Sequence, residues 1–355
     1  MFPWAESTSF PSREQSRKED PFQTNANQIL FLPEASDYIG TSAQESLSLA
    51  RPVASSPFVT GLQAAAAQHS IAVHVGIHVP VSVPVNPAAS NPAIASANPP
   101  PSIPASEETI PGTAATQTTT TKLYNRTIYI SPTGSLVPSA SYDKLHLFDY
   151  AALRESASTQ AGARLIPPIP SPVGRLGSLI CFDLRFPEPA LHLTRPHHSH
   201  SHSHSHSHAS DRLEDAPDGP AQILLYPSAF TVPTGRAHWE VLLRSRAIET
   251  QSYVIAAAQV GAHNVHVGGP SLSSDGAAKK KPRVSYGHGM VVDPWGRVIL
   301  EMKGVRPDWD GENAEDAVED GAVGELGVVD IDLAEWERVR EKMPLIRRTD
   351  VYPEI

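Results

Sequence analysis

The sequence predicts one mixed α/β domain interrupted by two long insertions. Short apolar runs typical of buried strands alternate with amphipathic segments of helical period. Two stretches of biased composition interrupt this pattern, one rich in Pro, Ala, Ser and Thr at about 80–121 and one rich in His and Ser at 195–219. The chain has 355 residues, enough to bury a sizeable core. We expect the domain to span 28–345, with a disordered or non-native segment at 1–27 and a tail at 346–355.

The ordered elements expected before the nucleophile candidate are short. They are a strand at 29–32 ended by Pro33, two helices within 42–69, and strands at 71–79, 126–130 and 139–143. The later elements follow a more regular pattern. They are a helix at 188–194, a strand at 222–226, a helix at 235–250, a strand at 253–260, a hairpin at 290–300, a strand at 325–331, and a last helix with Leu333, Trp336, Val339 and Met343 on one face.

Charge and composition exclude several classes of protein. The net charge of −10 argues against a nucleic-acid binder. No apolar run reaches the roughly 20 residues needed to cross a bilayer, so we expect no membrane partner. The single cysteine excludes an internal disulfide and a cysteine-rich zinc site. Residues 1–27 lack the apolar core of a secretory signal and carry several acidic residues, so we expect a cytoplasmic protein.

The two insertions are interpreted as solvated loops. Nine prolines between Pro80 and Pro111 are incompatible with a helix or a central strand. The block 197–208 contains seven of the 16 histidines, and we interpret it as a loop that binds metal incidentally. A dedicated metal-binding or metal-buffering role is the alternative. The entropic cost of closing a loop grows only with the logarithm of its length. We therefore expect neither insertion to disturb a site elsewhere.

Three chemically reactive residues follow predicted strands. Cys181 ends an apolar run and enters a turn toward a helix, where free backbone N–H groups would favour its thiolate. Taken alone, its sequence position favours a small buried side chain that fills space. Glu34 and Lys144 also follow strands, although each could be a surface or ion-paired residue. Together the three supply a nucleophile, a proton carrier and an oxyanion-stabilising cation, as cleavage of an amide or nitrile requires.

Five stretches resemble the nitrilase (carbon–nitrogen hydrolase) superfamily and, with the strands between them, cover most of 28–345. They are LFLPEASDYIG (30–40), YDKLHLFD (142–149), LICFDLRFPE (179–188), ILLYPSAFTVPTGRAHWEVLLRSRAIETQSYVIAAAQVG (223–261) and SYGHGMVVDPWGRV (285–298). The resemblance implies an α-β-β-α four-layer sandwich that commonly forms homodimers. It implies catalytic roles for Glu34, Lys144 and Cys181, with a supporting glutamate at Glu155. It also implies a thioester intermediate, no metal and no cofactor.

Within that superfamily, YPSAF, TGRAHWEVLLRSRAIETQ and SYGHGMVVDPWG look most like the deaminated glutathione amidases, which release 2-oxoglutarate and Cys-Gly. The alternative is an ω-amidase acting on 2-oxoglutaramate or 2-oxosuccinamate. Either substrate is a small anionic amide, so a cation should face its carboxylate. Arg185 is the first candidate, or else a structural partner of neighbouring acids. Thr231 and Tyr286 are further candidates for lining the pocket, and the N–H of Phe182 for holding the oxyanion.

The N-terminus departs from the family pattern. Family members normally have a strand and a long helix before the segment that carries the glutamate, and residues 1–27 supply neither. We therefore expect one of two cases: the natural start differs from Met1, or the protein is a non-catalytic relative impaired by this change. The chain between Asp149 and Glu155 is also shorter than the family pattern.

Overall fold

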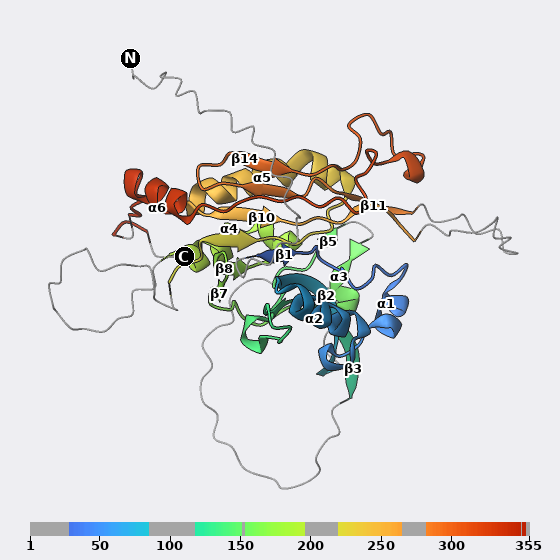
Figure 1. Ribbon diagram of the computed structural model, residues 1–355. Helices are drawn as coiled ribbons and strands as arrows, with labels where there is room; N and C mark the ends of the chain where they lie inside the picture. The colour runs from blue at the N-terminus through green and yellow to red at the C-terminus, as the bar shows by residue number, and fades with distance from the viewer. Residues whose placement is uncertain are drawn as a thin grey trace, which may run out of the picture.

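Two β-sheets packed face to face form the centre of the molecule (Figure 1). The computed structural model describes residues 28–84, 118–150, 153–195, 219–264, 282–348 and 350–352. The expected segment 1–27, most of both insertions and the end of the tail lie outside the described residues.

The first sheet has four strands in the order β1-β2-β3-β4. Strand β1 (Ile29–Phe31) runs parallel to β2 (Ala72–Pro84), which pairs antiparallel with β3 (Thr119–Ile130), and β4 (Tyr142–Asp143) pairs with β3. The connection from β1 to β2 contains the helices α1 (Ala43–Leu49) and α2 (Pro57–His69). A helix is the usual crossover between parallel strands.

The second sheet has six strands in the order β14-β13-β10-β9-β8-β7. Its strands are β7 (Ile169–Ser171), β8 (Gly174–Ser178), β9 (Ile223–Leu225), β10 (Tyr253–Ala256), β13 (Met290–Val292) and β14 (Val298–Glu301). The three central strands β8, β9 and β10 are parallel, and the outer pairings are antiparallel. Helices α4 (Pro187–Thr194) and α5 (Val232–Thr250) form the crossovers after β8 and β9.

Alternation along the strands divides the apolar residues among three interfaces. In β10, Val254 and Ala256 pack in one cluster with residues of α5, whereas Tyr253 and Ile255 pack in the cluster between the sheets. In β2, Val73 and Val75 pack against α2 in a third cluster. Since successive strand side chains point to opposite faces, this pattern gives a helix layer, two sheets and a second helix layer. The expected α-β-β-α sandwich is confirmed.

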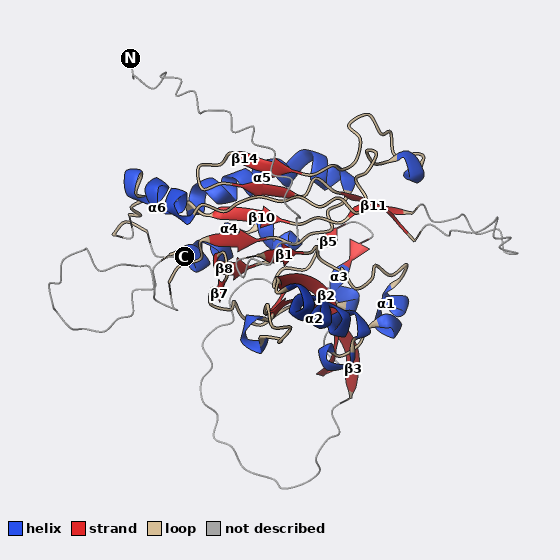
Figure 2. Cartoon of the chain, viewed as in Figure 1, coloured by secondary structure: helices blue, strands red, loops and turns tan. Residues whose placement is uncertain are grey.

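The remaining elements are short (Figure 2). They are the hairpin β11 (Val260–His263) with β12 (Arg283–Tyr286), the hairpin β5 (Asp149–Tyr150) with β6 (Leu153–Arg154), helices α3 (Glu155–Ser158) and α6 (Leu333–Lys342), and the 3-10 turns Val53–Ser55, Pro138–Ala140, Cys181–Arg185 and Ala314–Asp316.

Strand β2 runs further than the sequence suggested, through Pro80 to Pro84. Its even-numbered residues turn their backbone polar groups away from β3: the carbonyl of His74 accepts from Leu32, and the N–H of Gly76 donates to Pro33. Both prolines are even-numbered, so the missing N–H of each removes no bond to β3. The paired strands therefore reach Pro84 and Thr119, inside the limits expected for the insertion.

Three expected strands differ from the structure. The expected strand at 325–331 is wrong: no ladder forms there, and the N–H of Lys303 donates to the Glu325 side chain instead. Of the stretch 139–143 only Tyr142–Asp143 is strand, because Pro138–Ala140 forms a 3-10 turn. The stretch 253–260 is divided, since β10 ends at Ala256 and β11 begins at Val260 in another sheet.

Candidate active site

The ends of three strands bring four predicted site residues together. Glu34 follows β1, Lys144 follows β4, and Cys181 follows β8, while Glu155 begins α3. The first two belong to the four-stranded sheet and Cys181 to the six-stranded sheet. We call these four residues the reactive cluster.

The Lys144 ammonium lies between two carboxylates. Its Nζ donates to Glu34 Oε1 at 2.9 Å and to both Glu155 oxygens at 3.0 Å. Lys144 is 2% exposed and Glu34 is 5% exposed, so this ion pair is shielded from solvent. Buried charges require good geometry and further hydrogen bonds to offset the loss of hydration.

Further hydrogen bonds hold the two carboxylates. Asn125, on the inward face of β3, donates from Nδ2 to Glu34 at 2.6 Å and to Glu155 at 3.2 Å. The backbone N–H of Phe148 donates to Glu155 Oε2 at 2.7 Å. Glu155 is thus positioned by two segments besides Lys144, and the cluster is a connected network rather than a set of separate pairs.

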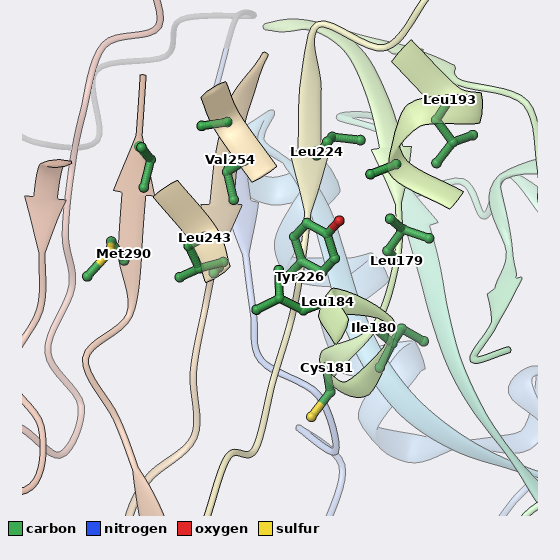
Figure 3. Packing of buried hydrophobic residues seen from close by; sticks show 14 of the residues in the cluster. Leu179, Ile180, Cys181, Leu184, Leu193, Leu224, Tyr226, Leu243, Val254 and Met290 are labelled. Atoms are coloured by element: carbon green, nitrogen blue, oxygen red, sulfur yellow. The ribbon is translucent and has the colours of Figure 1, made fainter. Parts of the chain in front are cut away.

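Cys181 lies at a sharp turn between β8 and the 3-10 turn that it begins. Its φ of +46° is in the left-handed region, which costs a non-glycine residue about 1–3 kcal/mol. The backbone N–H of Cys181 donates to Pro227 at 3.1 Å. In Figure 3 the sulfur points away from the apolar side chains of the cluster that includes Leu184 and Ile180. The turn therefore directs the thiol away from these side chains, close enough to Glu34 for the two groups to act on each other's pKa.

The charges of the cluster follow from burial and mutual attraction. Burial raises the pKa of the Cys181 thiol, as does the negative charge of Glu34, and these outweigh the opposing effects of Lys144 and the Ala229 backbone. Burial alone would raise the pKa of Glu34, but Lys144 and the hydrogen bonds it receives lower it overall. Burial alone would lower the pKa of Lys144, but Glu155 and Glu34 hold it well above its ordinary value. The resting site contains a neutral thiol beside an ionised carboxylate.

Close backbone packing holds the Glu34 segment. A Cβ on Gly76 would lie 2.7 Å from Glu34 Cα and 2.9 Å from the Pro33 carbonyl oxygen. The glycine thus allows β2 to approach the turn after β1, and its N–H donates to the Pro33 carbonyl at 3.1 Å. On the other side, Gln259 Nε2 donates to the carbonyls of Glu34 at 2.9 Å and Ala35 at 3.2 Å.

The expected substrate-binding residues lie in the segments around the cluster. Arg185 ends the turn that Cys181 begins, and its Nη2 lies 2.7 Å from His238 Nδ1 on α5 rather than on a neighbouring acid. Thr231 caps the start of α5 and forms a backbone bridge with Ser285, next to Tyr286.

Two further contacts complete this description. The Tyr286 ring packs against Gly235. Phe182 packs edge-on against Phe148, with ring centroids 5.1 Å apart. Among the described residues, Arg185, Thr231 and Tyr286 make no hydrogen bond to the reactive cluster.

Sequence reasoning missed three polar residues that support the site: Asn125, Asp183 and Gln259. All three bind groups on other strands or turns. For Asn125 the available signal was position, because it lies on the same buried face of β3 as Leu123 and Thr127, two residues from each.

The described residues contain neither a metal-binding group nor a membrane-spanning helix. No group of three or more His, Cys, Asp or Glu side chains there could hold a metal ion. No helix in the same ranges combines the length and apolarity needed to span a bilayer. The His/Ser block lies outside the described residues.

The family model described as carbon-nitrogen hydrolase matches residues 102–208 and 216–341. The chain belongs to the carbon-nitrogen hydrolase family. The matched part of this carbon-nitrogen hydrolase contains Lys144, Glu155 and Cys181, whereas Glu34 precedes it.

Named relatives agree with this assignment. The chain is 33% identical over 331 residues to the probable hydrolase nit2 of Schizosaccharomyces pombe, covering 92% of this chain and 87% of that protein. It is 37% identical over 238 residues to the deaminated glutathione amidase of Mus musculus, covering 65% of this chain and 55% of that protein. The chain thus spans about half the length of that amidase.

Solved structures share the fold. The crystal structure of the Caenorhabditis elegans NitFhit protein matches with a TM-score of 0.57 and 31% identity, covering 92% of this chain and 58% of that one. Saccharomyces cerevisiae Nit3, a member of branch 10 of the nitrilase superfamily, matches with a TM-score of 0.53 and 23% identity over 90% of this chain and 82% of that one.

Proposed function

We propose that this carbon-nitrogen hydrolase is a thiol amidase that works through a thioester on Cys181. The observation that supports the proposal is the contact of an ionised carboxylate with an ammonium, beside a neutral thiol, where the two sheets meet. A thiol is a poor nucleophile until its proton leaves, and Glu34 is the base within reach.

In the proposed reaction, Glu34 takes the thiol proton while the sulfur attacks the amide carbonyl carbon. The carbonyl oxygen becomes an oxyanion, which Lys144 and the N–H of Phe182 stabilise. Glu34 then gives its proton to the leaving nitrogen as the carbon–nitrogen bond breaks, and the acyl group remains on Cys181 as a thioester. Glu34 next takes a proton from water, hydroxide displaces the sulfur, and the thiol regains the proton.

Glu155 is proposed to hold the ammonium in place. It contacts Lys144 through both oxygens, which leaves the Nζ aimed between Glu155 and Glu34. A second carboxylate also keeps Lys144 protonated despite its burial. The ammonium is thereby present at neutral pH and does not give its proton to Glu34.

The proposed substrate is deaminated glutathione, with 2-oxoglutarate and Cys-Gly as products, and the names of several relatives support this choice. An ω-amidase activity on 2-oxoglutaramate or 2-oxosuccinamate is the competing candidate. The reactive cluster has two carboxylates and one ammonium, so an anionic substrate needs another cation. Arg185 suits this role, because its Nε is buried with no hydrogen-bond partner in the described part of the chain, and a substrate carboxylate would supply one. We further propose a cytoplasmic homodimer.

The single cysteine makes the chemical test unambiguous. The purified protein is mixed with deaminated glutathione, quenched in acid and analysed by mass spectrometry. We expect an acyl adduct on the peptide containing Cys181 and none in the C181A variant. An adduct on another residue rejects the scheme. A comparison of kcat/KM for deaminated glutathione and 2-oxoglutaramate then decides the substrate, since equal values would remove the basis for the narrower assignment.

A further inference from the structure

The reactive cluster is divided between two sheets that touch mainly through apolar side chains. Glu34 and Lys144 belong to the four-stranded sheet and Cys181 to the six-stranded sheet. Apolar packing is non-directional, so it does not by itself set the position of the ammonium or the carboxylate relative to the sulfur. Polar contacts that cross from one sheet to the other near the cluster must supply that alignment.

Asp183 makes one such contact. It is fully buried, two residues after Cys181, and its Oδ2 accepts from the Tyr142 hydroxyl at 2.7 Å and from the Ile180 N–H at 3.0 Å. Its Oδ1 accepts from the backbone N–H of His146 at 2.9 Å and lies 2.8 Å from His146 Nδ1.

The partners of Asp183 surround the catalytic lysine. Tyr142 and His146 stand two residues before and two residues after Lys144. The carboxylate therefore holds both sides of the segment that carries the ammonium against the turn that carries the sulfur. Its bond to the Ile180 N–H fixes the same carboxylate within that turn.

Gln259 makes the second contact, on the opposite side of the cluster. It follows β10 of the six-stranded sheet, and its backbone N–H is held by the Ser228 carbonyl at 2.9 Å. Its side-chain amide donates to the carbonyls of Glu34 and Ala35. Ala35 has a φ of +55°, so the chain turns sharply where Gln259 holds it.

We propose that Asp183 and Gln259 are positioning residues that align Lys144 and Glu34 with the Cys181 sulfur across the two sheets. This inference rests on the proposed function. Neither residue needs to touch the substrate. Loss of either one leaves the reactive side chains present but misaligned, and a displacement near 1 Å lowers the rate of an enzymatic reaction by about 100-fold.

The test uses D183N and Q259M with a matched control. D183N keeps the volume but places an NH₂ or a weaker acceptor against four donors, and Q259M keeps the length but donates no hydrogen bond. Asp293 is the control: it is equally buried, at 2% exposed, and accepts from the backbone of Trp295 and Arg297 in the β13–β14 turn. D293N should lower the melting temperature as D183N does.

Two readouts separate alignment from stability. The first is kcat and KM per folded molecule, and the second is the pH dependence of iodoacetamide alkylation of the only cysteine, which needs no substrate. For D183N and Q259M we expect kcat to fall at least tenfold and KM to change less than threefold. The midpoint pH of alkylation should differ from that of the wild type. D293N should match the wild type in both readouts.

The outcomes are distinct. A folded D183N with the wild-type kcat and alkylation profile overturns the proposal, as does a loss of kcat in D293N equal to that in D183N. If D183N does not fold, Q259M decides by the same two readouts, and wild-type behaviour there overturns the proposal. A wild-type protein that hydrolyses no amide would contradict the proposed function, while the alkylation profiles would still test the alignment.

Discussion

Replacement of Gly76 by alanine should damage catalysis more than folding. The added Cβ would lie 2.7 Å from Glu34 Cα, whereas ordinary contact begins at 3.4 Å, a shortfall of about 0.7 Å. The obstacle is backbone, so no side-chain rotation relieves it. The Glu34 segment must move, and it carries the proposed base.

The expected magnitudes follow from that displacement. Overpacking of this kind costs about 1–3 kcal/mol of unfolding free energy. A movement of about 0.7 Å at the base should lower kcat by roughly 10- to 100-fold. Urea unfolding measures the first quantity, and steady-state amide hydrolysis, corrected for the folded fraction, measures the second.

Gly61 provides the matched control. It lies within α2, and a Cβ there would meet nothing within 4 Å. Since alanine is favoured over glycine in helices by about 1 kcal/mol, G61A should stabilise the protein slightly and leave kcat unchanged. If G76A retains the wild-type kcat, the close approach of β2 does not position Glu34 and the reasoning is wrong.

Three other substitutions test separate parts of the structure. K144M should abolish measurable hydrolysis and raise the pKa of Glu34, because Lys144 is the main factor that lowers it; a variant with more than a hundredth of the wild-type kcat would contradict the assigned role. R185A should raise KM at least tenfold with less effect on kcat, as measured with an anionic and a neutral amide, and equal effects on the two amides would exclude carboxylate binding. Burial lowers the pKa of His74 to about 3. Below pH 6.5 the unfolded chain therefore binds a proton at this side chain that the folded chain does not bind. The free energy of unfolding should then fall as the pH drops below 6.5, by up to about 1.4 kcal/mol per pH unit. In urea titrations between pH 7 and 5, H74Q should lose the part of the slope that this one proton contributes, whereas H69Q, at an exposed position, should keep it. The slope that remains in H74Q comes in part from His263, whose pKa burial lowers to about 4.

The elements that could be predicted from the sequence were those with a clear period or a sharp end. The helix expected at 235–250 and the strand expected at 222–226 appear as α5 and β9. The buried residues of α5 recur at helical spacing, and every residue of β9 is buried. The stretch 325–331 has an alternating pattern too, but Leu326 is 60% exposed and Val328 is 78% exposed. A period alone does not show whether a neighbouring strand is available to pair with.

The site was predictable only in part, and for a physical reason. Glu34, Lys144 and Cys181 each follow a strand, which is visible locally. The partners of these residues depend on how two sheets dock, and sequence spacing carries no record of that docking. Asp183 and Gln259 are short polar side chains whose importance comes from what they face, so only the three-dimensional structure indicates it.

The distance along the chain between Gln259 and Glu34 affects when activity can arise. The two are separated by 225 positions, so a polypeptide still being synthesised cannot complete the turn that carries its base until the strand before Gln259 has left the ribosome. A nascent chain would then contain its sulfur and its ammonium well before it could hydrolyse anything. Turnover should accordingly be among the last properties gained during synthesis.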